Sequence, residues 1–159
     1  MGIRSTAKAI IIHDKKILLN KCYDEYNGYY YSLPGGGQNK FETLENAVVR
    51  ECLEETGYKV KILRFCALFE EICTNPKFTE KYADYVHKMY HIFLCDIESF
   101  DRKELSETDI MQTGCEWIDL KSIDSIKIMP TVIKENMYDI IYNKKTLFLG
   151  SENIMYGHG

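Results

Sequence analysis

The pattern of apolar and polar positions at the start of the chain predicts three strands. Apolar residues dominate 5–13 and 16–22, and Asp14 and Lys15 separate the two runs. A short polar interruption between two such runs is typical of a β-hairpin. A loop then leads to a third predicted strand at 29–33.

The periodicity next changes to that of an α-helix. Leu44, Ala47 and Val48 recur at the i, i+3, i+4 spacing of a buried helix face. Thr43 is a good N-cap candidate, and Gly57 fits the position just after the last helical residue, where glycine commonly ends a helix. These signals predict a helix of about 13 residues, nearly four turns, between Thr43 and Gly57.

The rest of the chain predicts three more strands and a second helix. The strands lie near 59–71, 86–97 and 114–118. Pro130 suits the first position of the second helix. Its buried stripe would be formed by Ile133, Met137, Ile140 and Ile141. This order predicts an α+β fold with a mixed sheet between helices, an α/β/α sandwich.

The apolar stripe of the first helix runs into three carboxylates. One turn further along, its positions hold Glu51, Glu54 and Glu55. A solvated charged face is the ordinary alternative, but such a face would not line up with the buried stripe. Like charges within one turn repel one another unless something neutralises them. Arg50 can offset one charge through an i,i+4 pair with Glu54, and a divalent cation can offset the rest.

The residue types around this cluster predict metal-assisted hydrolysis of a phosphate-bearing substrate. All-oxygen ligation favours Mg²⁺ or Mn²⁺ over zinc, which prefers histidine and cysteine. Mg²⁺ commonly binds through one or two carboxylates together with substrate phosphates. The three glycines at 35–37 let a ligand approach the main chain closely. A bound metal would neutralise developing charge and activate a water for attack on phosphorus.

The segment from Gly36 to Tyr58 resembles the Nudix box, G-x(5)-E-x(7)-R-E-U-x-E-E-x-G-U, where U is a bulky apolar residue. Cys52 and Tyr58 occupy the two U positions. The seven fixed identities all match, at Gly36, Glu42, Arg50, Glu51, Glu54, Glu55 and Gly57. More weakly, similarity to the family extends over most of 5–142, and it implies the same mixed sheet between helices.

The resemblance implies a pyrophosphohydrolase that acts on a nucleoside diphosphate linked to another group. It assigns the divalent ions to Glu51, Glu54 and Glu55, together with the backbone carbonyl of Gly35. Arg50 would orient one of these glutamates, so the catalytic set is Arg50, Glu51 and Glu54. Gly36, Glu42 and Gly57 would have structural roles in the box.

The general base varies across the family, and sometimes it lies in a later loop. Glu107 and Asp109, in the acidic stretch 104–109, are the candidates for such an outside carboxylate. The alternative for both residues is a solvated acidic loop.

Two aromatic segments are candidates for recognition of the substrate. They are 23–31 and 75–85, and the second is longer than a hairpin connection needs. Exposed aromatic side chains can stack on a nucleobase. Tyr26, Phe78 and Tyr82 are therefore candidates for contact with substrate or with the partner in a homodimer.

Length and composition limit the number of domains, the class of partner and the compartment that we expect. We expect one domain over 1–149 and a loose tail over 150–159. A net charge of −4 gives no electrostatic footprint for nucleic acid, and no apolar run is long enough to cross a membrane. The six cysteines are spread singly, and the start of the chain lacks the pattern of a signal peptide. Both features predict a reduced, cytoplasmic protein.

Two other functions fit the same resemblance. The first is a Nudix-like domain that binds nucleotides as a sensor or scaffold without cleaving them. Binding alone does not require the metal cluster, so the intact Glu51, Glu54 and Glu55 favour the enzyme. The second is an isopentenyl diphosphate isomerase, which would need a catalytic cysteine, and no cysteine here has a supporting constellation.

Overall fold

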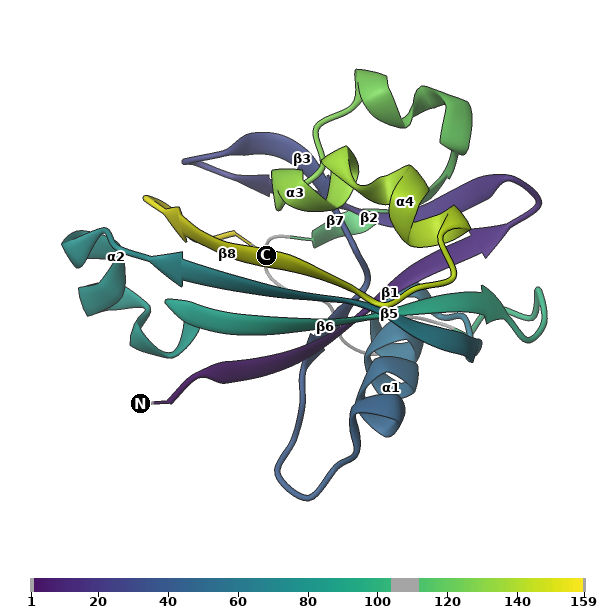
Figure 1. The fold of residues 1–159 in the computed structure, drawn as a ribbon, viewed down its shortest axis with the longest axis horizontal. Coiled ribbons are helices and arrows are strands. Elements are labelled where there is room, and N and C mark those ends of the chain that lie inside the picture. Colours follow the sequence, from purple (N-terminus) through teal and green to yellow (C-terminus); the bar gives the residue numbers. More distant parts are fainter. Residues whose placement is uncertain (1, 104–111, 159) are drawn as a thin grey trace.

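The computed structural model describes residues 2–103 and 112–158, which form one mixed sheet with helices on both faces (Figure 1). The strands are β1 (Arg4–His13), β2 (Lys16–Asp24), β3 (Gly28–Ser32), β4 (Gly35–Gly37), β5 (Val60–Cys73), β6 (His87–Ile97), β7 (Gln112–Asp119) and β8 (Leu147–Ile154). The α-helices are α1 (Leu44–Thr56), α2 (Pro76–Lys81), α3 (Thr131–Glu135) and α4 (Met137–Tyr142). The 3₁₀ helices are η1 (Ala83–Tyr85) and η2 (Leu120–Ser125).

The strands follow the order β3-β2-β1-β6-β5-β8, while β4 pairs with β1 and β7 pairs with β2. The pairs β1–β6 and β5–β8 are parallel, and the other pairs are antiparallel. The β1–β2 pairing is confined to the residues next to the hairpin turn. Further along β1, Thr6 to Lys8 pair with β4 instead. This change of partner places the glycine turn beside β1.

Two apolar clusters lie on opposite faces of the sheet. One cluster joins α1 to the sheet and includes Ala47, Val48 and Cys52. The other contains Ile133, Met137 and other buried residues of α3 and α4. Figure 1 accordingly shows α1 on the opposite side of the sheet from α3 and α4. The predicted fold class is confirmed.

Helix α1 has the predicted bounds and caps. The Thr43 hydroxyl accepts a hydrogen bond from the backbone N–H of Asn46 at 3.1 Å. At the other end, Gly57 has a φ of 79° and donates its N–H to the carbonyl of Leu53. Both caps satisfy backbone groups that a helix end leaves unpaired. The prediction from the capping residues is therefore confirmed.

The second predicted helix is interrupted. Instead of one helix opening at Pro130, the structure has α3 and α4, separated at Asn136. The side-chain amide of Asn136 donates to the carbonyl of Val132 at 2.8 Å, and its backbone leaves the helical region. Pro130 lies just before α3 as its N-cap residue. The predicted apolar stripe is nevertheless buried at Ile133, Met137 and Ile140.

The prediction of a loose tail over 150–159 is wrong for most of that segment. Residues up to Ile154 belong to β8, which pairs in parallel with β5. Beyond this strand, His158 is only 4% exposed. The pairing partners lie about 80 residues apart in the sequence, so the local composition does not reveal them.

All six cysteines are free thiols, and five of them are buried. Burial raises the pKa of Cys66 and Cys95 to about 12. In the part of the chain that the structure describes, none of the helices combines the length and the apolar character that a membrane crossing requires.

Candidate active site

The glycine turn before α1 packs closely against both β1 and α1. Gly35 has a φ of 136°, and a Cβ at this position would clash with the carbonyl oxygen of Ala7. A Cβ at Gly36 would lie 2.6 Å from Oε2 of Glu51. At Gly35 the neighbouring atoms belong to the backbone, so only glycine fits there, whereas at Gly36 the nearest atoms are the end of the Glu51 side chain. The carboxylate of Glu51 is thereby seated directly against the backbone of the turn.

Arg50 ties α1 to the loop that precedes it. Its Nε donates to Oε2 of Glu42 at 2.7 Å, and its Nη2 donates to Oε1 of Glu42 at 2.9 Å. Nη2 also donates to the carbonyl of Gly37 at 3.0 Å. The hydrogen bonds from Arg50, with a further one from the backbone N–H of Asn39, lower the pKa of Glu42 to about 2. Glu42 thus links the loop before α1 to the helix through its ion pair with Arg50.

The remaining nitrogen of Arg50 contacts two other glutamates. Nη1 donates to Oε1 of Glu51 at 2.9 Å and to Oε2 of Glu54 at 3.2 Å. The predicted i,i+4 pair with Glu54 is thus present, although Glu42 is the two-point partner. A single guanidinium places one oxygen of Glu51 and one of Glu54 around the same nitrogen. It offsets part of their mutual repulsion.

Glu55 lies deeper than the other two glutamates of the cluster. It is 9% exposed, and its Oε2 accepts hydrogen bonds from Nδ2 of Asn20 at 2.7 Å and from the N–H of Gly35 at 3.2 Å. Burial raises the pKa of Glu55 to about 7, even though Lys8 and these hydrogen bonds oppose the shift. Burial likewise raises the pKa of Glu51, against the opposing influence of Arg50.

Lys8 on β1 reaches the same turn from the other side. Its Nζ donates to the carbonyl oxygen of Gly35 at 3.2 Å. Its positive charge also favours the ionised forms of Glu51 and Glu55. The carbonyl that the resemblance assigns to a metal therefore already accepts a hydrogen bond from a cation.

The donor set fits a divalent metal that prefers oxygen. Glu51, Glu54 and Glu55 supply carboxylates, and Gly35 supplies a carbonyl. Burial disfavours the charged forms of Glu51 and Glu55, and a bound cation would offset that cost. Among the residues described, no three acidic, histidine or cysteine side chains already converge as a metal cage. An ion such as Mg²⁺ could bind through one or two of these carboxylates and complete its shell with water and phosphate oxygens.

Two of the three aromatic candidates for substrate contact, Tyr26 and Phe78, touch residues 156 and 157 of the chain itself, and Tyr82 packs on Phe78. Tyr26 is 48% exposed and stacks on Tyr156, with ring centroids 4.9 Å apart. Phe78 lies on α2, not on an open loop, and is buried against Gly157. Tyr82 packs against Phe78 at 4.7 Å. Phe78 is thus covered by its own chain.

The candidate outside carboxylates Glu107 and Asp109 lie outside the described residues. Two other residues of the site were not predicted from the sequence. They are Lys8 and Asn20, which contact Gly35 and Glu55. The available signal was weak: each is a polar residue inside or just after an apolar strand run.

Comparisons with known proteins identify the family of the domain. A sequence model of the NUDIX domain matches residues 3–141. The curated "Putative nudix hydrolase 1" of Caenorhabditis elegans is 28% identical over 132 residues, which cover 80% of this chain and 32% of that protein. The chain therefore spans about a third of the length of this relative.

Solved structures share the fold. A NUDIX hydrolase from Nitrosomonas europaea has a TM-score of 0.69 and 21% identity, over 91% of this chain and 93% of that chain. A UDP-X diphosphatase has a TM-score of 0.65 and 17% identity, over 96% of this chain and 68% of that chain. Since the NUDIX domain matches most of the sequence and every fixed position of the box is filled, the chain belongs to the Nudix family.

Proposed function

We propose that the protein is a divalent-metal-dependent pyrophosphohydrolase that cleaves a nucleoside diphosphate linked to another group. The observation that supports this proposal is that Arg50 is bonded to both Glu51 and Glu54, while Glu55 accepts a hydrogen bond from the N–H of Gly35 in the glycine turn. The name of the similar UDP-X diphosphatase describes a substrate of this class for that protein.

The residues of the chain divide into ligands and groups that position them. Glu51, Glu54, Glu55 and the carbonyl of Gly35 are the proposed metal ligands. When bound, Mg²⁺ or Mn²⁺ would neutralise charge on the phosphates and lower the pKa of a bound water. Arg50 fixes Glu51 and Glu54 through Nη1 and so limits the geometries in which they can bind an ion.

Glu55 is positioned by two donors of its own. Asn20 and the N–H of Gly35 hold Oε2, which fixes the rotamer of the carboxylate relative to the turn. Lys8 adds a positive charge beside the same turn, where the phosphates of the substrate would lie. An acidic protein gains in this way a local positive contribution to the binding of a polyanionic substrate.

The proposal is tested with a panel of nucleoside diphosphate derivatives. Each compound is incubated with Mg²⁺, Mn²⁺, Ca²⁺ or excess EDTA, and the products are separated by chromatography. The panel includes ADP-ribose, UDP-sugars, diadenosine polyphosphates, oxidised nucleoside triphosphates and capped RNA. We expect cleavage with Mg²⁺ or Mn²⁺ and poor cleavage with Ca²⁺, whose longer bonds of about 2.3–2.6 Å would misplace the attacking water.

Two results would contradict the proposal in different ways. Full turnover in excess EDTA would contradict the metal requirement and, with it, most of the proposed mechanism. If the protein bound compounds of the panel and cleaved none of them, a non-hydrolytic sensor or scaffold would be the better description. Binding without cleavage would then be expected to persist after Glu54→Gln and Glu55→Gln.

A further inference from the structure

The segment that follows β8 turns back into the molecule. Gly157 and His158 are both buried, and His158 is 4% exposed. The ring of Phe78 lies so close to Gly157 that a Cβ there would clash with it. Figure 1 shows this end of the chain leaving the tip of β8 and running back toward the centre of the view. The residues 155–158 are called the return segment below.

The return segment covers four buried polar or aromatic side chains, called the polar floor: Tyr30, Glu71, Lys88 and Tyr90. Nε2 of His158 donates to Oε2 of Glu71 at 2.6 Å, and Nζ of Lys88 donates to the carbonyl of His158 at 2.9 Å. The hydroxyl of Tyr90 donates to Oε1 of Glu71 at 3.3 Å. The ring of Tyr30 meets the imidazole edge to face, with centroids 6.4 Å apart. Charged side chains are seldom buried as deeply as Glu71 and Lys88, at 2% and 6% exposed, unless they are paired.

The carboxylate of Glu71 is an anion in this floor. Burial raises its pKa, but the hydrogen bond and charge of His158 and the charge of Lys88 outweigh burial and leave the pKa below its usual value. The floor therefore offers one anionic acceptor, one ammonium and two phenol rings. This set can bind an aromatic heterocycle that carries N–H donors, and the imidazole of His158 is such a ring.

The floor adjoins the proposed active site. Tyr90 lines a small cavity together with Lys8, Ser32 and Leu33. Ser32 ends β3, and Leu33 follows it in the connection to the glycine turn. Lys8 in turn donates to the carbonyl of Gly35. Lys8, which donates to the carbonyl proposed as a metal ligand, and Tyr90, which donates to Glu71 beneath the return segment, thus line the same small cavity.

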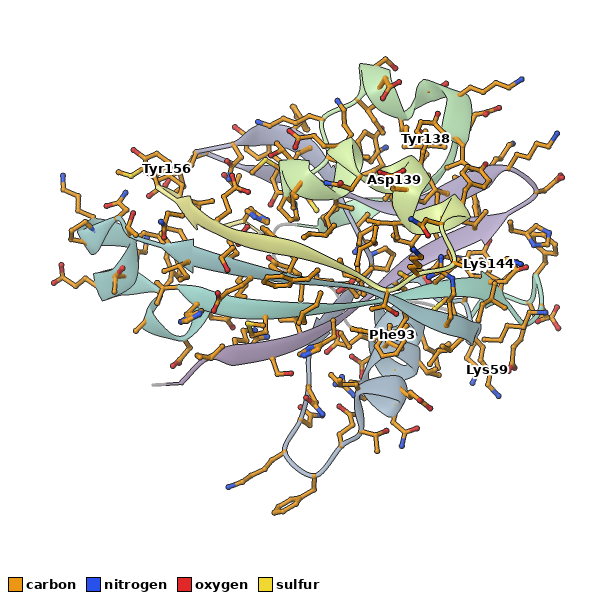
Figure 2. The ribbon with its side chains drawn as sticks, viewed as in Figure 1. Lys59, Phe93, Tyr138, Asp139, Lys144 and Tyr156 are labelled. Atoms are coloured by element: carbon orange, nitrogen blue, oxygen red, sulfur yellow. The ribbon has the colours of Figure 1, made fainter. Side chains whose placement is uncertain are left out.

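The outer part of the return segment is held by contacts that lie outside the floor. Tyr156 is 45% exposed and stacks on Tyr26, with an angle of 10° between the rings. Nδ2 of Asn27 donates to the carbonyl of Gly157 at 3.2 Å. Figure 2 shows Tyr156 beyond the end of β8 and well separated from Tyr138 on α4. The segment can therefore be loosened at Tyr156 without a change to Glu71 or Lys88.

We propose that the return segment is an intramolecular competitor of the substrate: His158 fills the subsite for a heterocyclic group, and the substrate must displace it. This inference rests on the proposed function, because it takes the displacing ligand to be a nucleoside diphosphate derivative. The polar floor would then serve two occupants in turn, the imidazole in the resting protein and the heterocycle of the substrate in the complex.

The test measures binding without hydrolysis. The ligands are the α,β-methylene diphosphates of adenosine, guanosine, cytidine and uridine, titrated calorimetrically in Mg²⁺ into the wild type and Tyr156→Ala. A stacked aromatic pair adds enough stability that its loss should tighten binding of at least one ligand by about 2- to 10-fold. Methylenediphosphonate, which lacks a heterocycle, should bind equally to both proteins.

Tyr142→Ala is the matched control. Tyr142 is also exposed and also stacks on a tyrosine at 10°, but its partner is Tyr138 on α4. We expect wild-type affinities for this variant. The inference is overturned if all four nucleoside ligands bind Tyr156→Ala no more tightly than the wild type, if the control tightens equally, or if none of them binds either protein.

A second measurement uses the unaltered chain. Hydrogen exchange of the backbone amides of the return segment should accelerate when a saturating nucleoside ligand is added, and unchanged or slower exchange would overturn the inference. Neither experiment depends on turnover. The protein could show both effects, tighter ligand binding by Tyr156→Ala and faster amide exchange in the return segment, and still cleave none of the panel. That result would contradict the proposed function but support the return segment as a competitor.

Discussion

The guanidinium of Arg50 and the carboxylate of Glu42 form a two-point ion pair, with 2.7 Å between Nε and Oε2 and 2.9 Å between Nη2 and Oε1. The same guanidinium uses its Nη1 to contact Glu51 and Glu54. One side chain therefore links the loop before α1 to two proposed metal ligands. A change in the Glu42 pair should consequently affect stability, and a change in Arg50 should affect both stability and catalysis.

The Glu42 pair predicts a defined loss of stability in acid. Its pKa in the folded protein is about 2, below the ordinary value of 4.5. The stabilisation is therefore complete above about pH 4.5 and is lost as the pH falls toward 2. Glu42→Gln should lower the free energy of unfolding at pH 7 by about 1 kcal/mol, because water screens a partly exposed pair, and the difference from the wild type should shrink near pH 2.5.

Urea unfolding of both proteins at the two pH values measures this effect. Glu135→Gln, which alters an exposed glutamate at the end of α3, is the control and should change stability little at either pH. An equal loss of stability at pH 7 and pH 2.5 after Glu42→Gln would show that the ion pair is not its cause.

Replacement of Arg50 should weaken catalysis through the glutamates that it holds. Arg50→Ala is expected to lower kcat by roughly 10- to 100-fold and to raise the Mg²⁺ concentration needed for half-maximal rate. Arg50→Lys keeps the charge but loses the planar fork, so it should recover only part of the rate. Steady-state rates across a Mg²⁺ titration provide the measurement. Unchanged rate and unchanged metal requirement in Arg50→Ala would contradict this positioning role.

Glu54→Gln and Glu55→Gln should separate folding from catalysis. Each removes a charge proposed to hold the metal, and a loss of about 4 kcal/mol of transition-state stabilisation corresponds to a fall of roughly 10³-fold in kcat. Without metal, Tm should hold or rise, because repulsion within the cluster is relieved and the Glu55 charge is buried. The increase in Tm that Mg²⁺ gives the wild type should disappear. Wild-type rates in both variants would contradict the proposed ligands.

Gly36→Ala should displace Glu51 while leaving most of the fold intact. The new methyl group would lie 2.6 Å from Oε2 of Glu51, at the far end of a side chain that can move. We expect a fall in kcat of at least about 10-fold with a small change in Tm. Gly2→Ala, where nothing lies within 4 Å of the new Cβ, is the control. A normal kcat in Gly36→Ala would show that the close contact between Gly36 and the Glu51 carboxylate is not needed for catalysis.

The sequence alone identified the box and the helix that carries it. The fixed spacing of the box residues, together with the capping signals of Thr43 and Gly57, predicted the bounds of α1 correctly. These features are local: helix period, N-cap chemistry and a left-handed glycine depend on neighbouring residues in the chain. Local signals failed at Asn136, where a side-chain hydrogen bond competes with a continuous helix.

The tertiary structure decided which distant residues complete the site. Sequence spacing indicated the Arg50–Glu54 pair, but only the folded loop brings Glu42 into two-point contact with Arg50. Lys8 and Asn20 reach the site because β1, β2 and the glycine turn meet there. Such contacts join residues that lie far apart in the sequence, so no local period encodes them.

The chain after α4 shows most clearly the difference between what the local sequence predicts and what tertiary contacts decide. Composition suggested a loose tail, yet β8 pairs with β5 and His158 is bonded to Glu71, 87 residues away. A strand is recognised from sequence by its alternation of buried and exposed side chains, and the described residues of β8 are half-buried or exposed. Its place is set by backbone pairing to an edge that exists only once the sheet has formed.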